Sequence, residues 1–309
     1  MMSSPIVPCL WLDDQAEEAA RFYTGLFPGG RVAAVSRYPD SFDNPGGKPR
    51  GSVSEVEFEV AGQRFTALNG GPQFVINPSI SFFVHTESAG ETDRLFAALA
   101  ADGQVMMPLD SYPWSQRYGW VQDRFGVSWQ VITEAPARPD AMPGATIVPC
   151  LMFTGAQHGR AEEAMKHYVG VFSDGPADSQ LGPIDRYSGE DGPAGTVKYG
   201  RFALAGQDMI AMDSHGDHGF GFSEGLSLQV RCETQEELDR CWATLSEGGQ
   251  PVECGWLKDR FGLSWQVLPA ALGEWLSSED SAARDRAFAA MFEMQKLDMA
   301  ALEAAFAGA

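Results

Sequence analysis

The sequence is short of cysteine and of basic residues, and each shortage excludes a class of protein. Its 309 residues include five cysteines, none in a C-x-x-C pair, which excludes a disulfide framework and a zinc site built from cysteines. Lysine and arginine number 22 against 42 aspartates and glutamates, giving a net charge of −20. Because this surplus of carboxylates repels phosphate groups, we expect neither nucleic acid nor a membrane surface as a partner.

Long apolar runs are also missing. No stretch of about eighteen apolar residues could cross a bilayer, and Met1–Cys9 lacks the basic and apolar regions of a secretory signal. The hydrophobic fraction of 44% and the charged fraction of 21% are typical of a folded globular chain. We therefore expect a soluble protein of the cytoplasm.

A tandem repeat organises the chain. Three segments of the first half are IVPCLWL (Ile6–Leu12), AEEAARFYTGLF (Ala16–Phe27) and DRFGVSWQV (Asp123–Val131). Their copies start at Ile147, Ala161 and Asp259, at offsets of 141, 145 and 136. The offset falls from 146 at Asp93, which recurs as Asp239, to 136 at Asp123. This fall predicts ten extra residues in the first half between Gly103 and Asp123, which we expect to lengthen a hairpin.

Composition marks the boundaries between the copies. Residues 134–145, EAPARPDAMPGA, are rich in proline and alanine, as linkers often are. We place a first domain at 1–137, the linker at 138–145, a second domain at 146–269 and a helical extension at 270–309. In the extension, Ser277–Ser281 and Asp298 can cap helices that pack on one domain or on a partner chain.

Hydrophobic periodicity predicts the order βαβββ twice in each half. In the first half, we expect strands at 6–12, 31–38, 52–60, 63–69, 79–84, 105–109, 118–122 and 127–132, with helices at 16–27 and 90–101. We predict an α+β fold of two cups, each an eight-stranded sheet formed by the two βαβββ modules of one half, with helices outside.

Several segments carry a resemblance to a known family. They are IVPCLWL, AGQRFTALNGGPQF, YPWSQRYGWVQDRFGVSWQV and CGWLKDRFGLSWQVLP. The chain resembles the PhnB-like branch of the vicinal oxygen chelate superfamily, which also contains glyoxalases, extradiol dioxygenases and bleomycin-resistance proteins. In its metal enzymes, His or Glu from the first and last strand of each βαβββ module hold a divalent ion that acts as a Lewis acid. Members of this branch often carry a demethylubiquinone methyltransferase-like label.

The ligands that this resemblance implies are mostly missing here. Gln130 and Gln266 stand where the family pattern has a ligating glutamate, and a neutral amide is a weak ligand that cannot act as a general base. The first strands offer Cys9 and Cys150 instead of histidine. Each thiol could ligate a soft metal, but a small buried hydrophobe inherited by duplication is the favoured interpretation.

The second half holds the densest group of metal-binding residue types. Asp213, His215 and His218 lie in DSHGDHGFGF, and the first half has Asn69 at the position equivalent to Asp213. Four glycines between 216 and 225 favour a solvent loop instead. We expect no cofactor, with a divalent metal as the alternative and His215 and His218 as its weak candidate ligands.

Other side chains are candidates for lining the cups. Ser128 and Gln130 share one face of their strand, whereas the Asp123 turn before them is expected to be structural. Trp114, in the aromatic insertion, is either a lid over a ligand or a plug that packs on the other half, and the need for an internal interface favours the plug. No catalytic residue is assigned. The candidate ligand-binding residues are Cys9, Asn69, Ser128, Gln130, Trp114, Cys150, Asp213 and Gln266.

One stripe of charge is expected to have no chemical role. Glu55, Glu57 and Glu59 alternate with apolar residues, and we interpret them as a solvated outer face.

Three functions are compatible with the sequence. The leading hypothesis is a small-molecule-binding protein of the resistance or sequestration type with a degenerate metal site. The alternative is a metal-dependent glyoxalase-type lyase or isomerase, or a dioxygenase, that uses the second cup, with Asp213, His215 and either Cys150 or Gln266 as ligands. The third is a methyltransferase, as the label implies, although no G-x-G-x-x-G joins a strand to a helix. The chain is expected to be a pseudo-dimeric monomer or a homodimer.

Overall fold

The computed structural model describes residues 6–133, 146–173 and 178–309, so the predicted linker at 138–145 lies outside the described residues. The first half contains two βαβββ modules. One consists of β1 (Ile6–Leu12), α1 (Ala16–Leu26), β2 (Arg31–Arg37), β3 (Val53–Val60) and β4 (Gln63–Asn69). The next consists of β5 (Ile80–Thr86), α2 (Ala89–Ala100), β6 (Gln104–Tyr112), β7 (Ser115–Gln122) and β8 (Ser128–Thr133).

The second half repeats this order. Its first module is β9 (Thr146–Phe153), the short helix η1 (Gly155–Gln157), α3 (Ala161–Val171), β10 (Gln180–Arg186), β11 (Val197–Leu204) and β12 (Gln207–Asp213). Its second module is β13 (Leu226–Cys232), α4 (Gln235–Ser246), β14 (Gln250–Pro251), β15 (Trp256–Lys258) and β16 (Ser264–Pro269). The predicted α+β class and the two eight-stranded sheets are confirmed.

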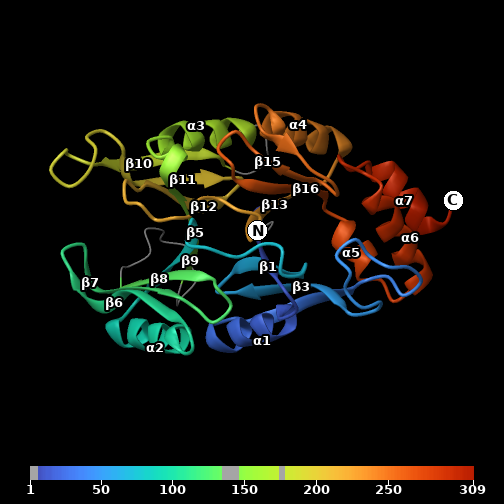
Figure 1. The fold of residues 1–309 in the computed structure, drawn as a ribbon, viewed down its shortest axis with the longest axis horizontal. Coiled ribbons are helices and arrows are strands. Elements are labelled where there is room, and N and C mark those ends of the chain that lie inside the picture. The colour runs from blue at the N-terminus through green and yellow to red at the C-terminus, as the bar shows by residue number, and fades with distance from the viewer. Residues whose placement is uncertain (1–5, 134–145, 174–177) are drawn as a thin grey trace.

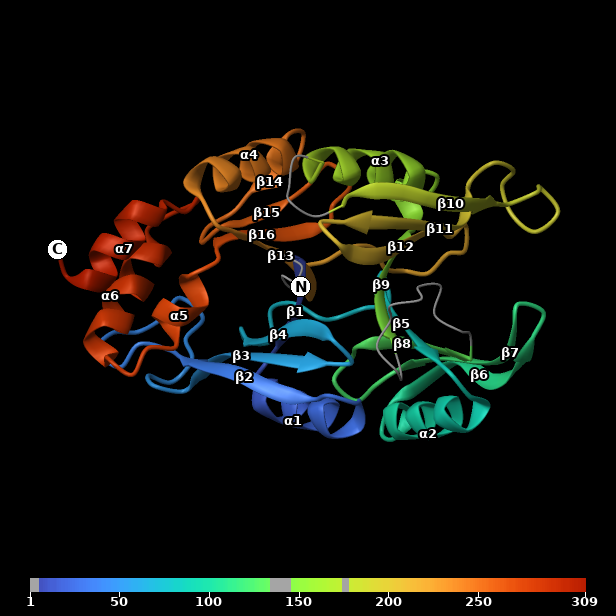
Figure 2. The ribbon, with the colours of Figure 1, turned by 180° about the vertical axis from the view of Figure 1, so that it is seen from behind.

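The membership of each sheet differs from the expectation. One sheet has the order β14-β15-β16-β13-β1-β4-β3-β2, and the other β10-β11-β12-β9-β5-β8-β7-β6. Each sheet therefore joins one module of the first half to one module of the second, through the antiparallel pairs β1–β13 and β5–β9. The helices lie on the two outer sides, α1 and α2 on one and α3 and α4 on the other, with the sheets between them (Figure 1; Figure 2).

Strand alternation explains why each helix packs where it does. In β3 the buried Val56, Phe58 and Val60 form one face, which packs against α1. Tyr23 of α1 stacks on Phe58 with ring centroids 5.9 Å apart. The outer face of each sheet is thus the apolar, helix-covered one, and the inner face is left for other chemistry.

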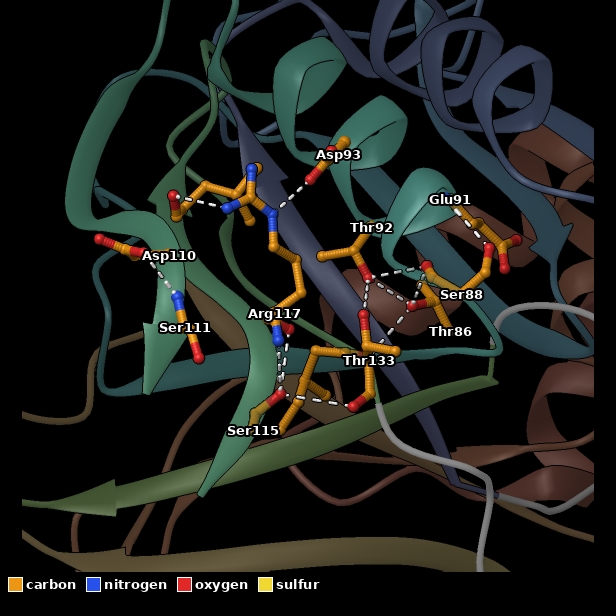
Figure 3. Close-up of polar contacts among 12 residues, drawn as sticks. Thr86, Ser88, Glu91, Thr92, Asp93, Asp110, Ser111, Ser115, Arg117 and Thr133 are labelled. Atoms are coloured by element: carbon orange, nitrogen blue, oxygen red, sulfur yellow. Dashed lines mark hydrogen bonds and ion pairs between the residues drawn. The ribbon is translucent and has the colours of Figure 1, made fainter. Parts of the chain in front are cut away.

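The predicted long hairpin of the first half is present. β6 and β7 span nine and eight residues, whereas β14 and β15 span two and three. Polar contacts anchor it to α2, since the Arg117 Nε donates to Asp93 at 2.5 Å (Figure 3). The hydroxyls of Thr86, Thr92 and Thr133 lie 2.5 and 2.7 Å apart and tie β5, α2 and β8 together.

Three helices form the C-terminal extension. They are α5 (Leu272–Leu276), α6 (Ser281–Phe292) and α7 (Met299–Ala307). The predicted caps are confirmed, because Asp280 accepts hydrogen bonds from backbone N–H groups of α6 and Asp298 from one of α7. Among the described residues, no helix combines the length and the apolar character that crossing a membrane requires.

The extension links the two edges of one sheet. Arg284 forms an ion pair of 2.7 Å with Asp40, in the loop after β2. At the other edge, the N–H of Cys254, between β14 and β15, donates to the carbonyl of Met294 at 2.7 Å. The sheet that contains β1 is therefore closed from edge to edge by helices, and Figure 1 shows α5 to α7 at that end of the molecule only.

Candidate functional site

Each sheet turns its helix-free face inward, and these two faces are the candidate sites. We call the inner face of the sheet that contains β1 cup A, and that of the sheet that contains β5 cup B. In both, the middle of the sheet is the junction between the two halves of the chain. Equivalent positions in the two cups can be compared directly, because the cups descend from the same repeat.

The floor of cup A is a network of neutral polar side chains. Gln229 accepts a hydrogen bond from the Thr66 hydroxyl at 3.0 Å and donates to the Gln266 carbonyl oxygen at 3.3 Å. Gln266 in turn donates to the Ser227 hydroxyl at 3.0 Å. Sequence reasoning found Gln266, but it missed Thr66, Ser227 and Gln229.

Charged side chains stand beside this network. Arg231 donates to Glu57 at 3.0 Å, and both side chains are almost covered, at 12% and 14% exposure. The expectation of a solvated outer face for the glutamates is therefore wrong for Glu57. The valines and the phenylalanine of β3 pack on the helix, so its glutamates turn into the cup.

The carboxyl group of Glu55 in cup A has a shifted pKa. Burial and the nearby Glu57 carboxylate raise the pKa of Glu55 to about 7, and Arg231 only partly offsets them. Within the described part of the chain, no hydrogen bond or ion pair is found for its carboxyl group. This carboxyl group changes its charge near neutral pH.

The floor of cup B has a smaller polar network. Gln130 accepts a hydrogen bond from the Tyr118 hydroxyl at 2.6 Å and donates to the Ser81 hydroxyl at 2.9 Å. Ser128 accepts one from the Trp120 indole N–H at 2.7 Å. The predicted pair Ser128 and Gln130 therefore lies in one cup, as the strand pattern indicated.

Apolar and aromatic side chains surround this network. Tyr199 meets Phe83 edge to face with ring centroids 5.9 Å apart. The cluster around them comprises Phe83, Tyr118, Ile132, Val148, Cys150 and Ile210, with Met107, Tyr112, Trp120, Tyr199 and Met212 at its margin. Cup B thus has aromatic and apolar side chains beside its polar network, where cup A has the charged pair Glu57 and Arg231.

The two predicted cysteines occupy equivalent places, one in each cup. Cys9 is paired in register with Ser227, and Cys150 with Ser81. Both are buried, and burial raises the pKa of each thiol to about 12. A protonated buried thiol is a poor nucleophile and a poor metal ligand, which fits the interpretation of a small buried hydrophobe.

Asn69 and Asp213 are placed outside the cups. The carboxylate of Asp213 accepts from the N–H groups of Gly159, Ala161 and Val197, at 2.7, 3.2 and 2.9 Å. Asn69 accepts from the N–H of Ala16 at 2.8 Å. Both side chains therefore fasten the start of a helix to the sheet, and their oxygens are already occupied.

His215, His218 and Trp114 are not brought together with the other candidates. His215 is exposed and faces Tyr187, while the His218 ring nitrogen lies 2.5 Å from the Ser214 hydroxyl. Trp114 is 59% exposed at the tip of the β6–β7 hairpin and stacks on Tyr112 of the same hairpin. The plug interpretation is wrong, because paired strands build the junction between the halves instead.

The DRFG turns are structural, as expected. Asp123 accepts two backbone hydrogen bonds and one each from the Tyr23 hydroxyl and the Trp129 indole, at 2.7 and 2.8 Å. Asp259 makes the same four contacts in the second half. Gly126 and Gly262 follow with φ of 85° and 84°, a conformation that favours glycine.

The residues present do not fit the divalent ion of the superfamily's metal enzymes. In cup A the first and last strands of the two modules present Cys9, Thr66, Gln229 and Gln266. In cup B the corresponding residues are Cys150, Ile210, Phe83 and Gln130. These are amides, protonated thiols, a hydroxyl and hydrocarbons. Across the part of the chain that the structure describes, no three His, Cys, Asp or Glu residues are grouped to hold a metal.

The ligand set of the metal-dependent alternative is also dispersed. Cys150 lies in β9 and Gln266 in β16, which belong to different sheets. His215 lies on a loop beyond β12, and the Asp213 oxygens bind backbone N–H groups. That set does not form a coordination site.

Comparisons with known proteins find similar sequences and structures. The family model described as 3-demethylubiquinone-9 3-methyltransferase matches residues 4–132 and again residues 145–268. A PhnB protein from Bacillus cereus is 37% identical over 41% of this chain and 98% of its own, with a TM-score of 0.38. A protein from Pseudomonas aeruginosa is 30% identical over 41% of this chain and 94% of its own, with a TM-score of 0.34. No curated protein sequence matches the chain.

A third solved structure resembles both halves together. Glyoxalase I from Zea mays is 11% identical over 84% of this chain and 90% of its own, with a TM-score of 0.52, which shows a shared fold. The family model covers both repeats, and the βαβββ modules have the order that the resemblance implied. Its fold is the one that the resemblance to the vicinal oxygen chelate superfamily implied. The chain therefore belongs to the 3-demethylubiquinone-9 3-methyltransferase family, as a tandem duplicate.

Proposed function

We propose that this protein binds a small, partly aromatic molecule in cup B without a catalytic metal. The observation that carries the proposal is the ring of aromatic side chains around Gln130. Tyr118 and Trp120 turn their polar tips to Gln130 and Ser128, and Trp120 is only half-buried, so its ring surface remains to contact a ligand. Gln130 itself stands where a metal enzyme of the superfamily would have a carboxylate.

Calorimetric titration with 2-naphthol, a neutral aromatic probe, tests the proposal. We expect saturable binding, weakened about tenfold in Trp120→Ala, since losing an aromatic contact costs about 1.4 kcal/mol. Trp256→Ala is the matched control, because Trp256 holds the equivalent position in cup A and its loss should leave naphthol binding unchanged. Equal affinities of wild type and Trp120→Ala would contradict the proposal.

Two further measurements separate this function from the alternatives. Elemental analysis of the purified protein would contradict it by showing a stoichiometric, tightly held divalent metal. A titration with S-adenosylmethionine tests the activity in the family's description. Saturable binding of that molecule would favour a methyltransferase over a binding protein.

A further inference from the structure

Three positions that face the cups carry opposite or altered charges in the two copies. Glu57 of β3 corresponds to Arg201 of β11, and Arg64 of β4 to Asp208 of β12, both at an offset of 144. Arg231 of β13 corresponds to His85 of β5, at an offset of 146. The duplication therefore provides an internal comparison of one set of positions with two sets of charges.

In cup A these charges neutralise one another. Glu57 lies 2.9 Å from Arg231 and 3.4 Å from Arg64, and the Glu57 and Arg231 side chains are almost covered. A second arginine nitrogen of Arg231 also donates to Gln229 at 3.1 Å. The guanidinium of Arg231 is thus fully committed within the protein.

In cup B the arginine lacks such a partner. No hydrogen bond or ion pair is found for the Arg201 side chain in residues 6–133, 146–173 and 178–309. His85 stands where cup A has the neutralising partner, and burial together with the Arg201 charge lowers the pKa of His85 to about 4. The imidazole is therefore neutral at neutral pH, and neither form of histidine carries the negative charge that would neutralise an arginine.

Arg201 lies between a hollow and the aromatic floor. It is half-buried, pairs in register with Ile210 of the apolar cluster, and lines an open hollow of about 330 Å³. Tyr199, two residues earlier on the same strand face, contacts Phe83. Asp208 lines the same hollow, but among the described residues no ion pair joins it to Arg201.

We propose that the ligand of cup B is an aromatic acid whose carboxylate binds the Arg201 guanidinium while its ring lies on the aromatic floor. This inference rests on the proposed function and gives it a ligand class. A planar guanidinium with several N–H donors matches a carboxylate better than any other side chain does, and the surrounding rings lower the local dielectric.

The experiment compares two probes of equal shape, 2-naphthoate and 2-naphthol, by calorimetry. We expect wild type to bind naphthoate at least tenfold more tightly than naphthol. Arg201→Gln should abolish that preference while keeping naphthol affinity, and Arg201→Lys should keep part of it. Arg64→Gln in cup A is the matched control and should behave as wild type. Circular dichroism and thermal unfolding check that each variant folds.

The outcomes separate the inference from the function beneath it. Naphthol binding with no preference for naphthoate would overturn the inference and leave the proposed function standing. A preference that survives Arg201→Gln would also overturn it, as would an undiminished preference in Arg201→Lys if Arg201→Gln does not fold. Failure of both probes to bind would overturn the proposed function and the inference together.

Discussion

Two buried aspartates each hold a helix and a strand together through hydrogen bonds. Asp123 and Asp259 each accept four hydrogen bonds, and two of the donors, a tyrosine of the preceding module's helix and a tryptophan of the following strand, are themselves fully buried. The Asp side chain thereby connects a helix of one module to a strand of the next. The sequence pattern D-R-F-G-x-S-W-Q-V predicted the turn, but the tyrosine donor, 100 residues away from Asp123, had no local signal.

Removing one donor should measure this connection. Tyr23→Phe deletes the hydroxyl that donates to Asp123, and a hydrogen bond to a charged group contributes about 1.5–3 kcal/mol, so unfolding free energy should fall by that amount. Urea denaturation provides the measurement. Tyr187→Phe, whose ring is half-buried, is the control and should cost less than 0.5 kcal/mol, roughly a surface substitution. Equal losses in the two variants would show that the Asp123 contact is not special.

Glu55 should make stability depend on pH. Its pKa in the folded protein is about 7, above the ordinary 4.5, so the folded state holds the proton more tightly than the unfolded state. The resulting stabilisation is complete below about pH 4.5 and is lost as the pH rises through 7. Glu55→Gln should flatten the change in unfolding free energy between about pH 5 and about pH 8, whereas Glu59→Gln, four residues along the strand, should not. An unchanged profile in Glu55→Gln would refute the assignment.

Alternation alone could not predict what the glutamate side chains of β3 contact. Val56, Phe58 and Val60 had to be buried, and the pattern placed the glutamates on the opposite face. In a single-layer sheet with one wet side that face is solvated, but here the opposite wall of the cup brings Arg231 onto it. Arg231 lies 174 residues from Glu57, so only the strand pairing shows the contact.

At the scale of elements, the C-terminal helices act as a brace across cup A. Asp285 of α6 accepts hydrogen bonds from the N–H and hydroxyl of Ser41 at 2.9 and 2.5 Å, and it is buried. The caps of α6 and α7 were predictable because aspartate before an apolar periodic run is a local signal. The surface on which these helices pack was not predictable, because Ser41 is 244 residues from Asp285 in the sequence.

Loosening this brace should be a local event. Asp285→Ala leaves the Ser41 N–H and hydroxyl unpaired, which should cost about 1.5–3 kcal/mol. Hydrogen exchange should become faster in α6 while α1 and α3 exchange as in wild type. Glu279→Ala, at an exposed site just before α6, is the control and should leave exchange unchanged. Faster exchange throughout the chain would mean that the helices are part of the global fold and not a brace.

At the scale of the whole molecule, each sheet takes one module from each half. The repeat predicted four modules and sixteen strands, but not which would pair. β1 resembles β9, and β5 occupies the same place in its module as β13, so pairing within a half and pairing between halves bury similar side chains. The local sequence pattern cannot distinguish these two ways of pairing. The pairing depends on the loops that connect the modules and on the strand pairs β1–β13 and β5–β9.

A half-chain experiment tests this topology. In residues 1–137 expressed alone, β1 and β5 lose their partners from the second half. Because the exposed edges can pair with those of a second copy, we expect a homodimer with two cups at micromolar concentrations. Analytical ultracentrifugation would show the mass. A stable folded monomer would mean that the two modules of one half can pair with each other.

The shared sheets also limit how the two copies can evolve. Gln130 comes from the first copy and Arg201 from the second, yet both belong to cup B. Each copy supplies one module to each cup, so neither copy is a spare that is free to drift. Specialisation of the cups must proceed module by module, with the second module of one copy and the first module of the other changing together. The opposite charges of Glu57 in cup A and Arg201 in cup B are an example of such divergence between equivalent positions.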